Sequence, residues 1–518
     1  MSPSDTIEIE LKFDVEAGLP APELFELVAA PSNSEQSTAA TEEGRATEEG
    51  RATEGSIGDP ETYLLEATYF DTADTLLAKN KITLRRRTGG TDAGWHLKRP
   101  SSVAGGRRET AISFEDGGDS EVPTALREQI LTVIRSAELV PVATITTDRT
   151  VTIVRDEHGR SLAEFCEDVV SAESLLPGGS TNRWAEWEFE LTGGDHKLLK
   201  RARKLLLAAG ARRASSESKL ARAIGTQPHD DLVRALPKKA SALGLVQFDL
   251  ATHRDALLMW DPIARENGHD AIHQMRVAAR KIRSILQSYP GAIAPEMSAP
   301  VADELRQLAE VLGDARDREV ALAANEHLLA RESAPADLVR VLIEDEQVRH
   351  ERSLKAVRFA MSTPRYLQML DDLDRLIEAP IPGHAATQDA RKAAAEAVGL
   401  SYAGMRRAEK KLKNLSAWSP EWVEQLHTVR KRAKAVRYTA ESADPLGRRA
   451  LAKAGAEAKS VQTHLGIFHD TVLNREHLAK AARNPALSRD ALFVLGRMDA
   501  HEESRGRRAV RKYRRSRR

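Results

Sequence analysis

The segment Glu8-Ile9-Glu10-Leu11-Lys12 carries three charged residues at alternate positions, with apolar residues between them. Successive side chains of a β-strand point to opposite faces, so the two carboxylates and the amine project from one face of this segment. Taken alone, the pattern is typical of a half-exposed strand with a solvated polar face. Its meaning depends on whether other strands carry charges in the same way.

Three later segments do. Arg85 and Arg87 share one face of a second predicted strand, Lys98 adds a cation in a third, and the segment 185–190 presents carboxylates on one face. These carboxylates belong to Glu186, Glu188 and Glu190. Acids hold hard metal ions through oxygen, and cations hold phosphate oxygens. A carboxylate and a phosphate chain repel each other without a bound cation, so the mixture favours a metal-bridged phosphate ligand in a charged concavity.

In chain order, these segments resemble the motifs of the CYTH family, the triphosphate tunnel metalloenzymes. The matching segments are 8–12, which resembles the family's ExExK strand, 69–72, 84–87, 97–100, 107–109, 148–149, 163–164, 186–190 and 218–220. The resemblance implies an α+β fold: an eight-stranded antiparallel barrel with a charged tunnel inside and helices on its apolar outer face.

The resemblance also implies a site that holds Mg²⁺ or Mn²⁺ and hydrolyses inorganic triphosphate. The implied metal ligands are Glu8, Glu10, Glu186, Glu188 and Glu190. The implied triphosphate-binding residues are Lys12, Arg85, Arg87, Lys98, Arg108, Arg149 and Lys219. The residues expected to take part in catalysis are Glu8, Glu10, Lys12, Arg85 and Arg87.

From about residue 240, long segments with apolar residues three and four apart replace the alternation and predict helices. One helix places a histidine and three arginines on a single face, and the same offsets return in a later helix. The two sets are His273, Arg276, Arg280 and Arg283, and His427, Arg430, Lys434 and Arg437. A solvated basic stripe is the ordinary interpretation of one such face. Repetition of the set instead indicates an internal duplication with two basic faces.

This half resembles the CHAD family, the conserved-histidine α-helical domain, in segments 273–281, 312–317, 427–431 and 465–470. The resemblance implies an all-α domain of two pseudo-symmetric four-helix bundles that binds inorganic polyphosphate. The candidate contacts are His273, Arg276, Arg280, Lys281, Arg283, His427, Arg430, Lys431, Lys434 and Arg437. If His273 and His427 titrate near neutrality, binding should strengthen at lower pH. Few aromatic or amide side chains accompany these cations, so sequence-specific nucleic-acid recognition is not expected.

The sequence predicts four regions. Residues 1–225 form the tunnel domain, in which 31–60 is a nearly apolar-free repeat insertion that we expect to be disordered. Residues 226–239 form a linker and 240–505 the helical domain. Residues 506–518 are expected to be a basic tail, part frayed helix and part flexible chain.

Composition limits the remaining possibilities. The chain has 77 basic and 77 acidic residues and a formal net charge of zero, so anion affinity must come from local clusters. The single Cys166 excludes an intrachain disulfide and zinc sites built from several thiolates. Without a long apolar segment, we expect no membrane contact and a cytoplasmic location, with association to polyphosphate granules.

Three functions stay open at this point. The leading one is hydrolysis of inorganic triphosphate, with the helical domain tethering the protein to polyphosphate. A second is adenylate cyclase or thiamine triphosphatase activity, because relatives with a similar tunnel act on other triphosphates. The third is a non-enzymatic adaptor that binds polyphosphate or targets granules. The sequence leaves the oligomeric state unknown.

Overall fold

The computed structural model describes residues 4–28, 55–100, 106–118, 120–225 and 236–517. The chain divides into two compact units, residues 1–231 and 232–518. The predicted linker, 226–239, lies mostly outside the described residues. Each unit is described by itself below.

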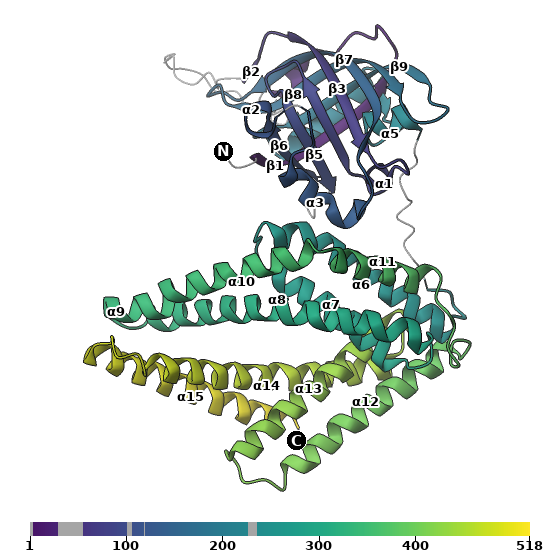
Figure 1. The fold of residues 1–518 in the computed structure, drawn as a ribbon. Coiled ribbons are helices and arrows are strands. Elements are labelled where there is room, and N and C mark those ends of the chain that lie inside the picture. Colours follow the sequence, from purple (N-terminus) through teal and green to yellow (C-terminus); the bar gives the residue numbers. More distant parts are fainter. Residues whose placement is uncertain (1–3, 29–54, 101–105, 119, 226–235, 518) are drawn as a thin grey trace, which may run out of the picture. The chain divides into compact units, whose positions relative to one another are not determined.

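The first unit is an antiparallel barrel whose sheet runs in the order β10-β1-β6-β5-β4-β3-β7-β8-β9 (Figure 1). Pairing between β1 and β9 closes it, with Glu10 opposite Glu190 and Lys12 opposite Glu188. The predicted eight-stranded barrel is thereby confirmed. Its long strands are β1 (Ser4–Val15), β3 (Glu61–Asp71), β4 (Thr83–Thr88), β5 (Gly94–Pro100), β6 (Gly106–Ser113), β7 (Val140–Arg155), β8 (Ser161–Ser174) and β9 (Thr181–Leu191).

Two short strands extend this sheet. β10 (Arg212–Arg213) pairs with β1, and β2 (Ser56–Ile57) pairs with β7. The position of β2 corrects part of the expected disordered insertion, because residues 55–60 are placed and partly paired. Residues 31–54 of that insertion lie outside the described part of the chain.

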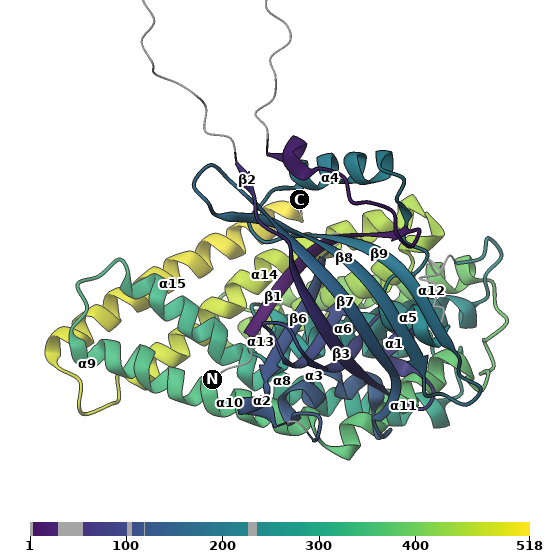
Figure 2. The ribbon, with the colours of Figure 1, turned by 90° about the horizontal axis from the view of Figure 1, so that it is seen from above.

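Helices cover the apolar outer face of the barrel. Trp95 and Leu97 of β5 pack with α3 (Thr124–Ile134), and Trp187 of β9 packs with α4 (His196–Ala208). The short helices η1 (Leu24–Leu27), α1 (Leu76–Lys79), α2 (Phe114–Gly117) and α5 (Lys219–Ile224) complete this layer. Figure 2 shows η1 next to α4. With apolar side chains on the outside, the alternate side chains of the same strands must face inward, and these are the charged ones.

The second unit is helical, as predicted. Its first half contains α6 (Ala242–Arg265), α7 (Ala271–Ser288), α8 (Pro295–Leu329), α9 (Ala336–Val339), the π-helical turn η2 (Arg340–Glu344), α10 (Asp345–Met361) and α11 (Pro364–Glu378). Its second half contains α12 (Ala390–Leu412), α13 (Pro420–Ser442), η3 (Asp444–Leu446), α14 (Arg449–Ala481) and α15 (Arg489–Ser516).

The two halves follow the same order of long helices but end differently. In the second half α15 is the last helix, whereas in the first half the corresponding stretch, α9 to α10, is followed after a break by a further helix, α11. Thr363 caps α11 with its side chain and Pro364 occupies its first turn. Proline cannot continue a preceding helix, so this dipeptide explains the break.

The halves contact each other in several places: alanines of α12 pack into the core formed by α6 and α7, and two further contacts lie elsewhere. Near the ends of α7 and α13, Ser288 Oγ lies 2.7 Å from Thr439 Oγ1, and the Tyr289 hydroxyl lies 3.0 Å from Ser442 Oγ. At the far ends of the two long hairpins, α8 with α10 and α14 with α15, a separate apolar cluster joins Leu328 to Leu478 (Figure 1). α7 and α13, which carry the two predicted basic faces, are therefore neighbours.

The predicted flexible tail is wrong for most of its length. Residues 506–516 belong to α15, with Val510 and Tyr513 buried in the core of the second half. The Tyr513 hydroxyl lies 3.2 Å from Glu409 Oε1, and Arg517 also bonds Glu409. Helical spacing of Val510 and Tyr513 puts both on one apolar stripe, which the many surrounding arginines concealed in the sequence.

Candidate functional site

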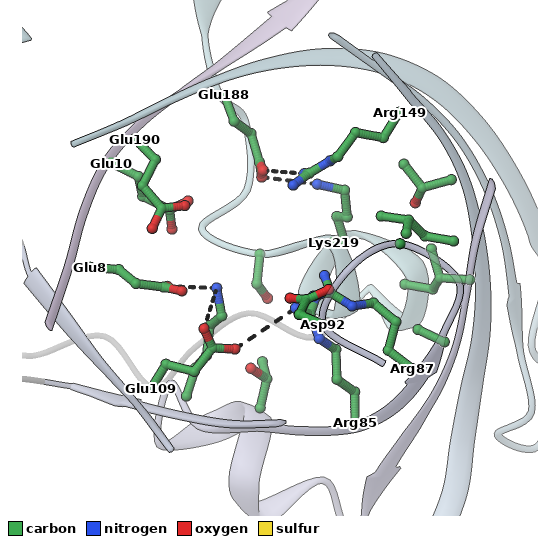
Figure 3. A pocket seen from close by; sticks show the side chains of 18 of the residues that line it. Glu8, Glu10, Arg85, Arg87, Asp92, Glu109, Arg149, Glu188, Glu190 and Lys219 are labelled. Carbon is green, nitrogen blue, oxygen red and sulfur yellow. Dashed lines mark hydrogen bonds and ion pairs between the residues drawn. The ribbon is translucent and has the colours of Figure 1, made fainter. Parts of the chain in front are cut away.

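A cavity of about 350 Å³ runs through the barrel, and strands from all around the sheet contribute to its lining. Of the residues predicted from sequence, the structure brings together around it Glu8, Glu10, Lys12, Arg85, Arg87, Lys98, Arg149, Glu188, Glu190 and Lys219. Figure 3 shows that carboxylates gather on one side and cations on the opposite side. The strand parity that sequence indicated thus produces one enclosed charged space.

The acidic side is formed by Glu8, Glu10 and Glu190, from the paired strands β1 and β9. Lys98 Nζ lies 2.6 Å from Glu8 Oε2. Burial, together with a hydrogen bond to Glu109, raises the pKa of Glu8 to about 8, and burial raises the pKa of Glu190 to about 7. This wall therefore holds more carboxylates than the protein's own cations neutralise, and a divalent cation with oxygen ligands fits it.

Glu188 lies deeper and is already neutralised. Lys12 contacts its Oε1, Lys219 Nζ lies 2.9 Å from the same oxygen, and Arg149 donates to Oε2. Burial opposes ionisation of Glu188, but these three cations outweigh it and hold its pKa well below the usual range. Glu188 thus fixes the cations that face the cavity.

A second acidic group lies behind Lys219. Oxygens of Asp168, Glu186 and Glu188 lie within 4.8 Å of one another, a spacing that can hold a metal ion. However, Lys219 Nζ lies 2.8 Å from Asp168, 2.6 Å from Glu186 and 2.9 Å from Glu188. The ammonium group occupies the position that an ion would take, so the Glu8, Glu10 and Glu190 wall is the better metal candidate.

Across the cavity, Arg85 and Arg87 project from β4, and Arg149 from β7. Burial, together with repulsion by the neighbouring Arg85 and Arg149, lowers the pKa of Arg87 to about 9. Arg87 pairs with Asp92, and the Arg85 guanidinium lies 3.5 Å from the Tyr69 hydroxyl. Crowded, buried cations of this kind are poorly solvated and favour a bound polyanion.

Glu109 links the two sides. Its Oε1 lies 2.9 Å from His96 Nδ1 and 3.8 Å from Arg85, while its Oε2 lies 3.8 Å from Lys98. Burial lowers the pKa of His96 to about 4, so the imidazole is neutral near pH 7. His96 therefore orients Glu109 without adding charge to the cavity.

Two residues that were predicted to belong to the site, Arg108 and Glu186, do not line the cavity. Arg108 lies on the outer face of β6, opposite Arg99 of the neighbouring strand β5. Arg107, one residue earlier, lines the cavity instead. Glu186 is also absent from the lining, because Lys219 and a 2.6 Å hydrogen bond from Trp184 hold its carboxylate. Adjacent arginines hide the parity of β6, and sequence could not show which one points inward.

Sequence reasoning missed several residues of the site. Glu109 follows the two arginines at the parity of Arg107, so correct placement of β6 would have found it. Asp168 lies on β8 opposite Glu186, but no family motif quoted above includes it. Asp92 comes from a loop, and nothing in its local sequence indicates that it meets Arg87.

In the second unit, the two basic faces meet. Arg276 and Arg280 of α7 act electrostatically on Arg430 and Lys434 of α13. Burial lowers the pKa of Lys434 to about 7, and repulsion by Arg430, Arg280 and Arg276 contributes. Arg430 also loses basicity through burial. Arg276 Nη1 lies 3.0 Å from Asp317 Oδ1, and Asp470 acts on both Arg430 and Lys434. The four cations still outnumber these two carboxylates, and the excess positive charge suits an extended anion.

Glycines let the arginines lie flat against neighbouring helices. A Cβ added to Gly313 of α8 would lie 3.3 Å from Arg276 Cζ, and one added to Gly466 of α14 would lie 3.8 Å from Arg430 Nε. The two glycines belong to the segments 312–317 and 465–470, each of which begins with Leu-Gly. Their positions explain the repeat: each supports the arginine of the adjacent basic face.

Other predicted contacts have different surroundings. Lys281 lies 3.2 Å from Glu441, which also bonds Arg437, so these two cations are already paired. Lys431 is exposed and Arg283 is partly buried. Burial lowers the pKa of both His273 and His427, with Arg316 and Lys431 respectively as the next causes. Both histidines therefore take up a proton less readily than a free imidazole, and their titration near neutrality stays a prediction.

A π-type contact distinguishes the second half. The rings of His427 and His469 lie 4.5 Å apart, whereas His273 of the first half faces Arg316. The duplication has thus kept the position of the histidine while changing its neighbour.

No helix within the described residues has both the length and the apolar character needed to cross a membrane. Comparison with known proteins places both units in families. The CYTH domain model matches residues 39–224, and the CHAD domain model matches residues 249–479.

An uncharacterised protein of Mycobacterium tuberculosis is 36% identical over 516 residues, which cover 95% of this chain and 92% of that protein. The CHAD domain of Ricinus communis covers 54% of this chain and 93% of its own, with 20% identity and a TM-score of 0.43. A putative adenylyl cyclase from Hippeastrum, described as having a dominant triphosphatase activity, covers 43% of this chain and 98% of its own, with 17% identity and a TM-score of 0.22. At these TM-scores the two solved structures carry no argument about function. The two domain matches and the full-length relative show that the chain belongs to the proteins in which a CYTH domain is followed by a CHAD domain.

Proposed function

We propose that the barrel is a metal-dependent hydrolase of inorganic triphosphate and that the helical unit binds inorganic polyphosphate. The observation that carries the proposal is the division of the cavity into an acidic wall and a basic wall. A triphosphate fits between them because cations bind its oxygens on one side. On the other side a divalent cation bridges it to carboxylates.

Glu8, Glu10 and Glu190 would hold the Mg²⁺ or Mn²⁺ ion. The ion would supply charge neutralisation and polarisation of a phosphoryl oxygen. Phosphoryl transfer depends mainly on positioning and electrostatic stabilisation, which the chain's own cations also supply. Arg85, Arg87 and Arg149 would orient the phosphate chain and stabilise charge that develops on the leaving oxygen.

Glu188 has a different task. Its pKa lies well below the usual range, so it is a poor acceptor for a proton from attacking water near pH 7. Instead it holds Lys12, Arg149 and Lys219 in place, and is a positioning residue.

The experiment measures phosphate release from tripolyphosphate, ATP and thiamine triphosphate with Mg²⁺ or Mn²⁺. We expect tripolyphosphate to be preferred and release to stop when the metal is chelated. Glu190→Gln should lose activity, whereas the exposed Glu16→Gln is the matched control. Preference for ATP or thiamine triphosphate would assign the other substrate class, and no release from any substrate would leave a binding adaptor.

The helical unit is proposed as an anchor for polyphosphate because Arg276, Arg280, Arg430 and Lys434 converge there. Tethering raises the local concentration of substrate without any new catalytic contact. The full-length Arg280→Glu/Arg430→Glu variant should lose its gel shift with long-chain polyphosphate. Lys410→Glu/Lys411→Glu, which alters exposed cations on α12, should keep it. An unchanged shift in the first variant would contradict the anchor.

A further inference from the structure

A second cavity adjoins the tunnel and has no role in the chemistry above. Its volume is about 780 Å³. Glu10, Lys12 and Arg107 line both this cavity and the tunnel, so the two spaces adjoin at these residues. Its remaining lining comes partly from β1, β5 and β6 of the barrel and partly from α4 and the segment around β10.

The position of this cavity follows from the pairing of β1. The N-terminal part of β1 pairs with β6 as far as Ile9, opposite Gly106. On the same edge, β10 pairs with β1 only at Phe13 and Asp14. β9 pairs with the opposite edge of β1. On the edge shared by β6 and β10, residues 10–12 have no strand beside them among the described residues. The tunnel and the second cavity meet at this interval.

The second cavity is basic. Of the residues that the structure describes, five cations line it against two carboxylates, Glu10 and Glu217; the cations are Lys12, Lys81, Arg107, Arg203 and Arg213. Glu217 lies 3.6 Å from Lys81. Arg203 and Arg213 are exposed, and within the described part of the chain neither is paired with a carboxylate. The excess of cations is therefore available to an anion that leaves the tunnel at this point.

We propose that this second cavity binds the part of a linear phosphate chain that extends beyond the three phosphates held in the tunnel. The proposal rests on the proposed function of the tunnel and extends its substrate class from triphosphate to longer inorganic phosphate chains. Such a chain carries a charge on every phosphate, so each added unit can meet another of these cations.

A nucleoside would need a different lining. Bases bind by stacking on aromatic rings and by amide or backbone hydrogen bonds. Phe13 is the aromatic residue in the described lining, together with aliphatic Leu11 and Leu207. Five cations and a single aromatic ring in the described lining suit a phosphate chain better than an uncharged base.

The test uses the full-length protein and two double variants. Arg203→Glu/Arg213→Glu reverses two charges that line the cavity. Arg201→Glu/Arg212→Glu reverses two exposed cations on the same elements that do not line it. The helical unit is identical in both variants, so its own affinity for polyphosphate cancels in the comparison.

The KM for phosphate release is measured with tripolyphosphate, longer-chain polyphosphate and ATP. We expect the first variant to raise the KM for the longer chain about tenfold or more, with tripolyphosphate and ATP unchanged and the control near wild type. Equal effects on tripolyphosphate and the longer chain, or the same loss in the control, would overturn the proposal. A selective loss for ATP would assign the cavity to a nucleoside and overturn it as well.

If the tunnel does not hydrolyse triphosphate, the second cavity is tested by binding measurements instead of kinetics. If the wild type releases no phosphate, calorimetric titration with tripolyphosphate and with the longer chain replaces the KM values. These titrations use the Arg280→Glu/Arg430→Glu background, which removes binding by the helical unit. A longer chain that binds no more tightly than tripolyphosphate, or a binding preference that survives Arg203→Glu/Arg213→Glu, would then exclude the second cavity.

Discussion

Within the barrel, neighbouring arginines of one strand have opposite roles. Arg85 and Arg87 face the cavity, whereas Arg86 lies over the Phe114 ring at 5.2 Å on the outer side. The protein uses three consecutive arginines to charge one face and cover the other. Their chemical identity is the same, and only strand parity separates them.

This parity can be tested by removing single arginines. Arg87→Ala should lower kcat/KM for tripolyphosphate by the equivalent of about 2 to 4 kcal/mol, because one preorganised cation is lost. Arg86→Ala should keep most of the activity and lose some thermal stability through its contact with Phe114. Equal losses of activity in the two variants would contradict the inward and outward assignment.

Lys434 should make polyphosphate binding depend on pH. Its pKa in the free protein is about 7, and a bound polyanion raises it, so binding takes up a proton. Affinity is therefore fully developed below about pH 7 and declines as the pH rises above that value. Calorimetric titrations between pH 6 and 9 should show this decline in the wild type. Lys434→Arg should flatten it, because arginine stays charged; an unaltered slope would transfer the effect to another group.

At the scale of the element, helices α8 and α14 do more than fill space. Each presents a glycine to the arginine of the adjacent basic helix. The contact is tighter at Gly313 than at Gly466, so the two copies of the motif should respond differently to the same substitution.

Gly313→Ala should stabilise α8 by up to about 1 kcal/mol through helix propensity. It should nevertheless weaken polyphosphate binding, because the added methyl group pushes the Arg276 guanidinium aside. Gly466→Ala has room for its methyl group and should leave affinity near the wild-type value. Urea unfolding and polyphosphate titration of both variants separate the two effects. An identical change in affinity would show that the spacing at Gly313 is not important.

The C-terminal end of α15 should be a structural element. Tyr513→Ala removes a buried ring and its contact with Glu409, and we expect a loss of about 3 kcal/mol in unfolding free energy. Arg511→Ala/Lys512→Ala changes two exposed cations beside Tyr513 on the same helix and should have little effect on stability. Chemical denaturation measures both. A stable Tyr513→Ala variant would restore the flexible-tail interpretation.

For the whole molecule, sequence predicted the class of each unit because alternation and helical spacing are local patterns. Glu8, Glu10 and Lys12 were found for this reason. The site was less predictable where partners come from distant strands: Asp168 and Glu109 acquire their roles from pairing across the barrel. The sequence could not show that Lys219 neutralises Glu186 whereas Glu190 belongs to the acidic wall, because these contacts arise only in the folded barrel.

Two separate anion-binding units should respond differently to salt. The basic faces of α7 and α13 are partly exposed, whereas the tunnel cations are buried. Raising the ionic strength from about 0.05 to about 0.3 M screens exposed charges more than buried ones. We expect hydrolysis of long-chain polyphosphate at low substrate concentration to fall more steeply than that of tripolyphosphate. Parallel salt curves for the two substrates would argue against capture by the helical unit.

The seam between β1 and β9 has a consequence for biosynthesis. Residues 10–15 of β1 have to wait for their partner β9 until the chain has grown past Leu191, whereas pairing of β1 with β6 and the intervening hairpins can form earlier. Such a late, non-local closing step is slow compared with helix docking, because a long loop must be closed before its contacts repay the entropy. During translation the nascent barrel therefore exposes two unpaired strand edges, which can pair with other chains. A chaperone would protect the protein most during this interval.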